Sequence, residues 1–224
     1  IIIAALVALI LLGGVKRIGQ VTEKLVPFMA LLYIVLSVGI ILFRIQALPS
    51  VIQAIFEGAF KPAAVTGGAV GSLFMSMKKG VSRGIFSNEA GLGTGSIAHA
   101  CADTRKPVKQ GMFGIFEVFM CTMVICTFSA MVILVTGTWT TGAPGSVLAI
   151  NAFGTIGLIG RLVASISLIL FAASSALSMS TSSGILAENL LGKAARKIMQ
   201  VLVVVFCFLG GTVGVDAALP WVDV

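Results

Sequence analysis

Two clusters of small and hydroxyl-bearing residues lie inside apolar stretches of the sequence, and they are its strongest candidates for binding chemistry. The first cluster runs from Thr66 to Ser72 and contains Gly67, Gly68 and Gly71. Glycine removes side-chain bulk and permits positive φ, so an unwound helix here would present free amides and a positive helix end to a carboxylate. Close packing of two helices through small residues is the other interpretation of the same pattern.

The second cluster holds seven Ser or Thr residues between Ser174 and Ser183. Hydroxyl and carbonyl oxygens on membrane helices are suitable Na⁺ ligands, which makes the adjacent Ser174 and Ser175 candidates for a sodium site. A hydroxyl inside a helix usually bonds back to its own backbone, so each of these residues also has a purely structural interpretation.

A few charged or titratable residues add to these clusters. Glu117 lies in an apolar stretch, where a carboxylate is costly and functional by default. It is a candidate for a cation or proton site, for a hydrogen-bonded pivot, or for a residue near the membrane interface. Arg83 and Glu89 are close in sequence, which favours a packing ion pair over catalysis. His99 has no Cys or second His nearby, which favours a structural role over metal binding.

The composition shows which environment must hold these residues. Of 224 residues, 58% are hydrophobic and only 10% are charged, whereas a soluble domain carries about 25% charged residues. Such a chain cannot cover itself with a water-compatible surface, which excludes secreted disulfide scaffolds, disordered regions and nucleic-acid-binding modules. The chain begins without Met inside an apolar run, so we expect an internal piece of a longer integral membrane protein.

The apolar stretches predict an all-α polytopic protein with one transmembrane domain, incomplete at both ends. A spanning helix needs about 20 apolar residues and satisfies its own backbone in lipid. The predicted spans are residues 1–13, 25–43, 62–77, 111–135, 162–186 and 198–215. The glycines make the third span discontinuous. Leu48–Phe60 is predicted as a short interfacial helix, because its apolar residues recur at helical spacing after Pro49.

The basic residues predict the direction of these spans. Twelve of the fifteen Lys and Arg residues fall in one set of connections, and only Arg44, Lys61 and Arg161 fall in the other. Cytoplasmic connections carry the excess of positive charge. Residues 14–24, the long loop 78–109 and residues 188–197 are therefore predicted to be cytoplasmic.

Several motifs resemble those of the alanine or glycine:cation symporter family, the sodium:alanine symporters. The most specific is GVSRGIFSNEAGLG at residues 80–93, followed by IAHA at 97–100. GGVKRI at 13–18, TEKLVPFMA at 22–30, PVKQG at 107–111 and TGTW at 136–139 also match. The resemblance therefore extends over nearly the whole chain.

The resemblance implies a LeuT-type fold of two inverted five-helix repeats, of which this chain would supply core helices 4–9. It implies a carrier of the plasma membrane, and no enzyme. Such a carrier couples Na⁺ entry to uptake of a small neutral amino acid, alanine or glycine, by alternating access. The coupling Na⁺ is the only cofactor implied, and the lipid bilayer is the remaining partner, with no role for nucleic acid.

The resemblance also assigns residues to sites. The break in core helix 6 matches Gly67, Gly68, Gly71 and Ser72, which would contact the substrate together with Ser175 and Met179. The sodium-binding segment of core helix 8 matches Phe171, Ser174 and Ser175. Coupling or structural roles fall to Glu117, Arg83, Asn88 and Glu89.

Two positions depart from the family pattern. Met179 stands where the family has Trp, which puts a flexible thioether in the side-chain pocket, and Glu117 stands where the family has Asp. Proton coupling, or a preference for glutamine or serine, are therefore alternatives. A membrane-embedded serine hydrolase using Ser174 or Ser175 is a further alternative, but it lacks a base at the same depth because His99 lies in a loop.

Overall fold

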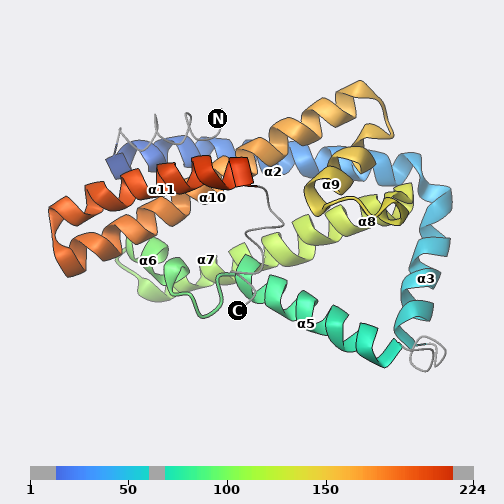
Figure 1. The fold of residues 1–224 in the computed structure, drawn as a ribbon, viewed down its shortest axis with the longest axis horizontal. Coiled ribbons are helices and arrows are strands. Elements are labelled where there is room, and N and C mark those ends of the chain that lie inside the picture. Colours follow the sequence, from blue (N-terminus) through green and yellow to red (C-terminus); the bar gives the residue numbers. More distant parts are fainter. Residues whose placement is uncertain (1–13, 61–68, 214–224) are drawn as a thin grey trace. The chain divides into compact units, whose positions relative to one another are not determined.

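The computed structural model describes residues 14–60 and 69–213, and every regular element in these two ranges is a helix (Figure 1). This confirms the predicted all-α class for the described part of the chain. The elements of the first half are α2 (Gly14–Phe43), the 3₁₀-helix η1 (Ile45–Ala47), α3 (Leu48–Phe60), α5 (Ala69–Ser87) and α6 (Thr94–Ala100). Those of the second half are α7 (Pro107–Phe119), the π-helix η2 (Met120–Cys126), α8 (Thr127–Thr136), the 3₁₀-helix η3 (Thr138–Thr141), α9 (Gly145–Gly154), α10 (Leu158–Leu191) and α11 (Lys193–Val213).

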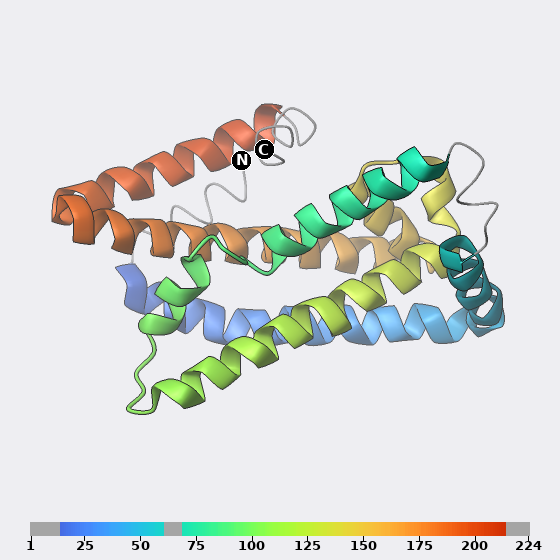
Figure 2. The ribbon, with the colours of Figure 1, turned by 90° about the horizontal axis from the view of Figure 1, so that it is seen from below.

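Three helices are long and apolar enough to cross a membrane. They are Val21–Phe43, Pro107–Thr136 and Leu158–Leu191, with mean hydropathies of 2.6, 2.5 and 2.0. They contain the predicted spans 25–43, 111–135 and 162–186, so three of the six spans have the expected length and composition. The segment Pro107–Thr136 is not a uniform α-helix. It is one continuous helical segment in which α7, the π-helix η2 and α8 follow one another (Figure 2).

The other three predicted spans are described only in part or not at all. Span 1–13 lies outside the described residues, as do residues 62–68 of span 62–77. The helix α5 begins at Ala69 and continues through residue 77 to Ser87. The helix α11 covers 198–213 of span 198–215, and residues 214–215 lie outside the described part.

Several predicted connections are more helical than the sequence indicated. Residues 14–24 belong to α2, and residues 78–109, predicted as a long loop, are helical to Ser87 and again over α6 and the start of α7. Between α10 and α11 only Gly192 is non-helical, at φ 90°, so most of 188–197 is helix rather than loop. The short helix predicted at Leu48–Phe60 is confirmed as α3.

The chain divides into two compact units, which are described one at a time. Unit 2 comprises Leu31–Gly91 and Phe116–Ile166. Within it α8 contacts α3, η2, η3 and α9, and Figure 1 shows α8 and α9 side by side. Its buried residues come from α2, α8, α9 and α10, and they are Tyr33, Ser37, Ile40, Val132, Val135, Ala149, Ala152, Phe153, Gly160 and Ala164.

Unit 1 comprises Ile1–Ala30, Leu92–Ile115 and Ser167–Val224. Its core follows one stripe of α10, formed by Ala173, Leu177, Ser180, Gly184 and Ala187. Residues three and four apart share one helix face, so this stripe is the packing surface of α10. The side chain of Arg196 on α11 crosses Gly184 and forms an ion pair with Glu188, which fastens α11 to α10.

Candidate functional site

The serine-rich stretch predicted to bind Na⁺ lies on α10 in unit 1, and its backbone is an unbroken helix. Ser174 Oγ donates to the Phe171 carbonyl at 2.9 Å, and Ser183 Oγ donates to the Met179 carbonyl at 2.7 Å. These two bonds are the local ones that the structural interpretation predicts. Ser175 differs, because it is exposed and its hydroxyl makes no hydrogen bond within the described residues.

Two further hydroxyls of α10 point into the core of unit 1. Ser182 is 3% exposed, and its Oγ donates to the Thr94 carbonyl of α6 at 3.5 Å, a long contact between segments distant in sequence. Ser180 is fully buried, and its Oγ has no hydrogen-bond partner within the described residues. A buried hydroxyl without a partner costs about 1–3 kcal/mol. The serine cluster therefore includes a buried hydroxyl, that of Ser180, that does not bond to its own helix.

The glycine-rich stretch is described only at its end. Gly67 and Gly68 lie outside the described residues. Gly71 and Ser72 lie inside the helix α5, so the helix break predicted over these four positions does not include the last two. They belong to unit 2, whereas Phe171, Ser174, Ser175 and Met179 belong to unit 1.

The signature motif at residues 80–93 forms the C-terminal end of α5 and the turn that follows. The Ala90 amide donates to the Ile85 carbonyl, and the Glu89 amide donates to the Phe86 carbonyl. This pair of bonds is the Schellman arrangement, in which the residue at position C′ adopts a left-handed conformation and is usually Gly. Here that residue is Glu89, at φ 52°, the one non-Gly residue with positive φ in the described part of the chain.

Asn88, the residue before Glu89, links this helix end to the π-helix. Its Nδ2 donates to the Gly84 carbonyl at 2.9 Å, and its Oδ1 accepts from Thr122 Oγ1 at 3.0 Å. Ser87 Oγ also lies 3.5 Å from Cys121 Sγ. Within unit 2 the signature motif is thus hydrogen-bonded to η2, and Asn88 is the residue that links α5 to Thr122.

Two other residues assigned to coupling, Arg83 and Glu117, lie on α5 and α7. Arg83 is half-buried on α5, about one turn before Asn88. Glu117 is exposed on α7, three residues before η2 begins. The structure therefore brings Asn88 to the π-helix and places Glu117 close to it along the chain.

A cluster at the centre of unit 2 was not predicted from the sequence. Tyr33 of α2 is 3% exposed, and its ring lies 5.0 Å from that of Phe153 on α9. The Tyr33 hydroxyl lies 2.7 Å from Ser129 Oγ on α8, and Ser129 Oγ donates to the Ile125 carbonyl of η2 at 2.7 Å. Tyr33 is the only Tyr of the sequence, and this rarity in a predicted span was the available signal.

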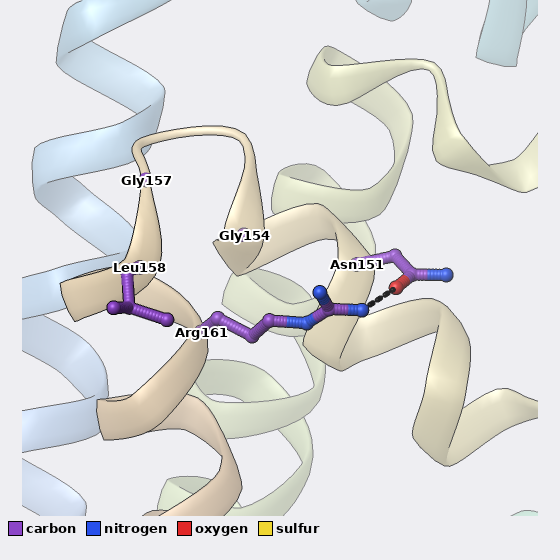
Figure 3. A pocket seen from close by; sticks show the side chains of 5 residues that line it. All are labelled: Asn151, Gly154, Gly157, Leu158 and Arg161. Atoms are coloured by element: carbon purple, nitrogen blue, oxygen red, sulfur yellow. Dashed lines mark hydrogen bonds between the residues drawn. The ribbon is translucent and has the colours of Figure 1, made fainter.

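The helix α9 was not predicted from the sequence. It lies in the connection between the predicted spans 111–135 and 162–186, where the flanking Gly and Pro residues indicated a loop. A shallow hollow of about 390 Å³ lies where α9 meets the start of α10 (Figure 3). It is lined by Asn151, Gly154, Gly157, Leu158 and Arg161. Arg161 Nη2 donates to Asn151 Oδ1 at 3.3 Å across this hollow.

His99 occupies a packed position in unit 1. Gln110 Nε2 lies 2.8 Å from His99 Nδ1, and the ring covers Gly114 of α7. A Cβ atom built on Gly114 would lie 3.4 Å from His99 Nε2. This is an ordinary contact distance, so the His99 side chain reaches α7 without requiring Gly at position 114.

Together these features define an α-helical integral membrane protein whose polar groups lie within long apolar helices. Buried hydroxyls and paired polar side chains inside apolar segments mark functional positions, because polar groups in lipid are rare and functional by default. The chain belongs to the sodium:alanine symporter family, whose sequence pattern matches residues 1–224. This is a family of transporters and not of enzymes, so the hydrolase alternative is excluded.

Named relatives support this assignment. The chain is 43% identical to an uncharacterized transporter of Haemophilus influenzae over 77% of this chain and 39% of the relative. It is 34% identical to the sodium/alanine symporter AgcS of Methanococcus maripaludis over 99% of this chain and 48% of that protein. It is 44% identical to the probable sodium/glutamine symporter GlnT of Bacillus subtilis over 60% of this chain and 27% of that protein. The chain thus spans less than half the length of these relatives.

Proposed function

We propose that the protein containing this chain is a sodium-coupled symporter of a small neutral amino acid that works by alternating access in the plasma membrane. The observation that carries the proposal is the match of the family pattern over residues 1–224. Three helices of spanning length and the unused hydroxyl capacity of α10 support it. Alanine or glycine is the expected substrate, in line with the name of the archaeal relative.

The proposed architecture is that of six spans, corresponding to core helices 4–9 of a LeuT-type fold. In this arrangement residues 14–24, 78–109 and 188–197 face the cytoplasm, because most of the basic residues lie there. Cysteine substitutions at Lys79 and at Arg44 would test it. A membrane-impermeant thiol reagent should label Cys at 44 in intact cells and Cys at 79 only after permeabilisation; the reverse pattern would exclude this topology.

The proposed sodium site uses Ser174 and Ser175, with the Phe171 carbonyl beside them. Ser175 is the sharper test, because its exposed hydroxyl makes no bond within the described residues and its loss leaves the helix intact. The matched control is Ser165→Ala on the same helix, since Ser165 Oγ donates to its own helix at the Arg161 carbonyl.

The decisive measurement is uptake of labelled alanine by the full-length protein in proteoliposomes. A Na⁺ gradient should drive uptake, and Ser175→Ala should raise the half-saturating Na⁺ concentration about tenfold while Ser165→Ala leaves it unchanged. Uptake driven equally well by a proton gradient without Na⁺ would replace sodium by proton coupling. An unchanged sodium response in Ser175→Ala would remove this residue from the site.

A larger substrate is the second candidate, and one observation favours it. Met179 is half-buried on α10, at a position to which the family resemblance assigns Trp, and one relative is named as a probable sodium/glutamine symporter. Competition of labelled alanine uptake by unlabelled glutamine and serine separates the two. Met179→Trp should weaken competition by glutamine if the thioether makes room for the longer side chain.

A further inference from the structure

The π-helix η2 interrupts a 30-residue apolar segment near its middle, and its own sequence does not require the interruption. Met120–Cys126 reads MCTMVIC and contains neither Gly nor Pro, the usual local causes of a helix irregularity. Short π-helices are rare and are frequently found at functional sites. Contacts from other elements must therefore hold this wider turn in place.

One of these contacts reaches η2 from α2. Ser129 Oγ uses its single hydrogen to bond the Ile125 carbonyl of η2, so the Tyr33 hydroxyl must be the donor in its 2.7 Å bond with Ser129. A tilted ring contact with Phe153, at 5.0 Å and 43° between the ring planes, holds the Tyr33 ring in place, because both residues are almost completely buried. The result is a directed chain of hydrogen bonds from α2 to a backbone carbonyl of the π-helix.

A second contact reaches η2 from the end of α5. Thr122 Oγ1 donates to Asn88 Oδ1 at 3.0 Å, while the Asn88 amide group is anchored on the Gly84 carbonyl. Thr127 Oγ1 also lies 3.4 Å from the Thr122 carbonyl. Asn88 and Tyr33 thus attach to η2 at two positions three residues apart, at Thr122 and at Ile125 through Ser129.

We propose that Tyr33 and Asn88 are positioning residues of the transporter, and that η2 is the joint whose register they hold during the conformational cycle. The inference rests on the proposed transport function. When either attachment is released, η2 can relax toward regular α-helix, and this turns the part of α7 that carries Glu117 with respect to α8. Because neither residue belongs to the proposed sodium or substrate site, their task is to set the rate of the conformational step.

The structural half of the proposal is tested by amide hydrogen exchange of the full-length protein in detergent micelles. Tyr33→Phe keeps the ring on Phe153 and removes only the hydroxyl, and Thr122→Val keeps the side-chain shape. Ser37→Ala is the matched control, since Ser37 is buried on the same helix and bonds only to the Tyr33 carbonyl of α2. Loss of one hydrogen bond changes a local equilibrium about fivefold.

We expect exchange of the amides of residues 120–129 to rise about fivefold in Tyr33→Phe and in Thr122→Val, and less than twofold in Ser37→Ala. The double variant Tyr33→Phe with Ser129→Ala should match the greater of its single variants, because both remove one chain of bonds. Exchange in Tyr33→Phe equal to that of the control would overturn the attachment.

The functional half is tested by uptake kinetics in proteoliposomes. In Tyr33→Phe and Thr122→Val the kcat of uptake should fall threefold or more, with the KM values for Na⁺ and amino acid within twofold of wild type. A normal kcat, or a change confined to KM, would refute a role for the joint in the cycle. A wild-type protein without any uptake would instead refute the proposed function, and the exchange measurement would still decide whether the two residues hold η2.

Discussion

Gly160, the third residue of α10, is the described glycine at which an added Cβ atom would meet the closest obstacle. A Cβ atom at position 160 would lie 2.3 Å from the Phe153 carbonyl oxygen and 2.5 Å from Ile156 Cγ1. Atoms of this kind require about 3.4 Å, so Gly160→Ala forces the end of α9 to move by about 1 Å. The end of α9 carries Phe153, which is 1% exposed and whose ring contacts that of Tyr33, so the shift reaches the core of unit 2.

The expected magnitude follows from this overlap. Overpacking of a tight core costs about 1–3 kcal/mol, with the upper half of this range expected because the obstacle is backbone rather than a flexible side chain. Replacement of Gly by Ala inside a helix stabilises the fold by up to about 1 kcal/mol, which offsets part of this cost. A net loss near 2 kcal/mol lowers the melting temperature by about 4–8 °C in a protein of 150–250 residues, and by less in a longer full-length protein.

The assay is thermal unfolding of the full-length protein in detergent, followed by intrinsic fluorescence and by retention of the monodisperse peak. Gly154→Ala is the matched control, because its Cβ would meet Arg161 Cβ at an ordinary distance of 3.7 Å. That variant should melt within about 2 °C of wild type, on either side. If Gly160→Ala melts together with Gly154→Ala, the tight contact between α9 and α10 is wrong.

Three further outcomes are expected in the same assay. Ser180→Ala should raise the free energy of unfolding by about 1 kcal/mol, since it removes a buried hydroxyl without a partner in the described residues, and a loss of stability would show that the hydroxyl is bonded. Glu89→Gly should stabilise by about 0.5–1 kcal/mol because it relieves a left-handed residue at φ 52°, whereas Gly91→Ala, at φ 87°, should destabilise. Glu188→Gln should cost less than about 1 kcal/mol and should lose its effect in high salt, because the ion pair with Arg196 is partly exposed; an effect insensitive to salt would contradict this.

Periodicity and composition were enough to predict the helical elements of the described part. The apolar stretches around Leu25–Phe43 and at 162–186 are long and nearly free of charge, and only a helix satisfies its own backbone in lipid. The helix Leu48–Phe60 was predicted with the observed bounds, because Pro49 and a 3.6-residue apolar spacing both act within the segment. Such signals are local, which is why sequence alone captures them.

Irregular and crowded regions were predicted less well. The dense Gly and polar residues of 78–109 indicated a loop, whereas α5 continues to Ser87 and ends in a Schellman turn with Glu89 in a position usual for Gly. The helix α9 was missed for the same reason. In both cases the sequence shows the Gly, Pro and polar residues that interrupt helices. It does not show the tertiary contacts that stabilise a helix beside them.

The sequence by itself determined that this is a membrane carrier of the sodium:alanine symporter family, because composition and the 80–93 motif are properties of the chain alone. Only the tertiary structure decided what Asn88 and Tyr33 contact, since their partners Thr122 and Ser129 lie 34 and 96 residues away. The π-helix η2 belongs to the same class of feature. Its sequence contains neither Gly nor Pro to mark the wider turn, and the hydrogen bonds that Asn88 and Ser129 make to it join segments that no local pattern connects.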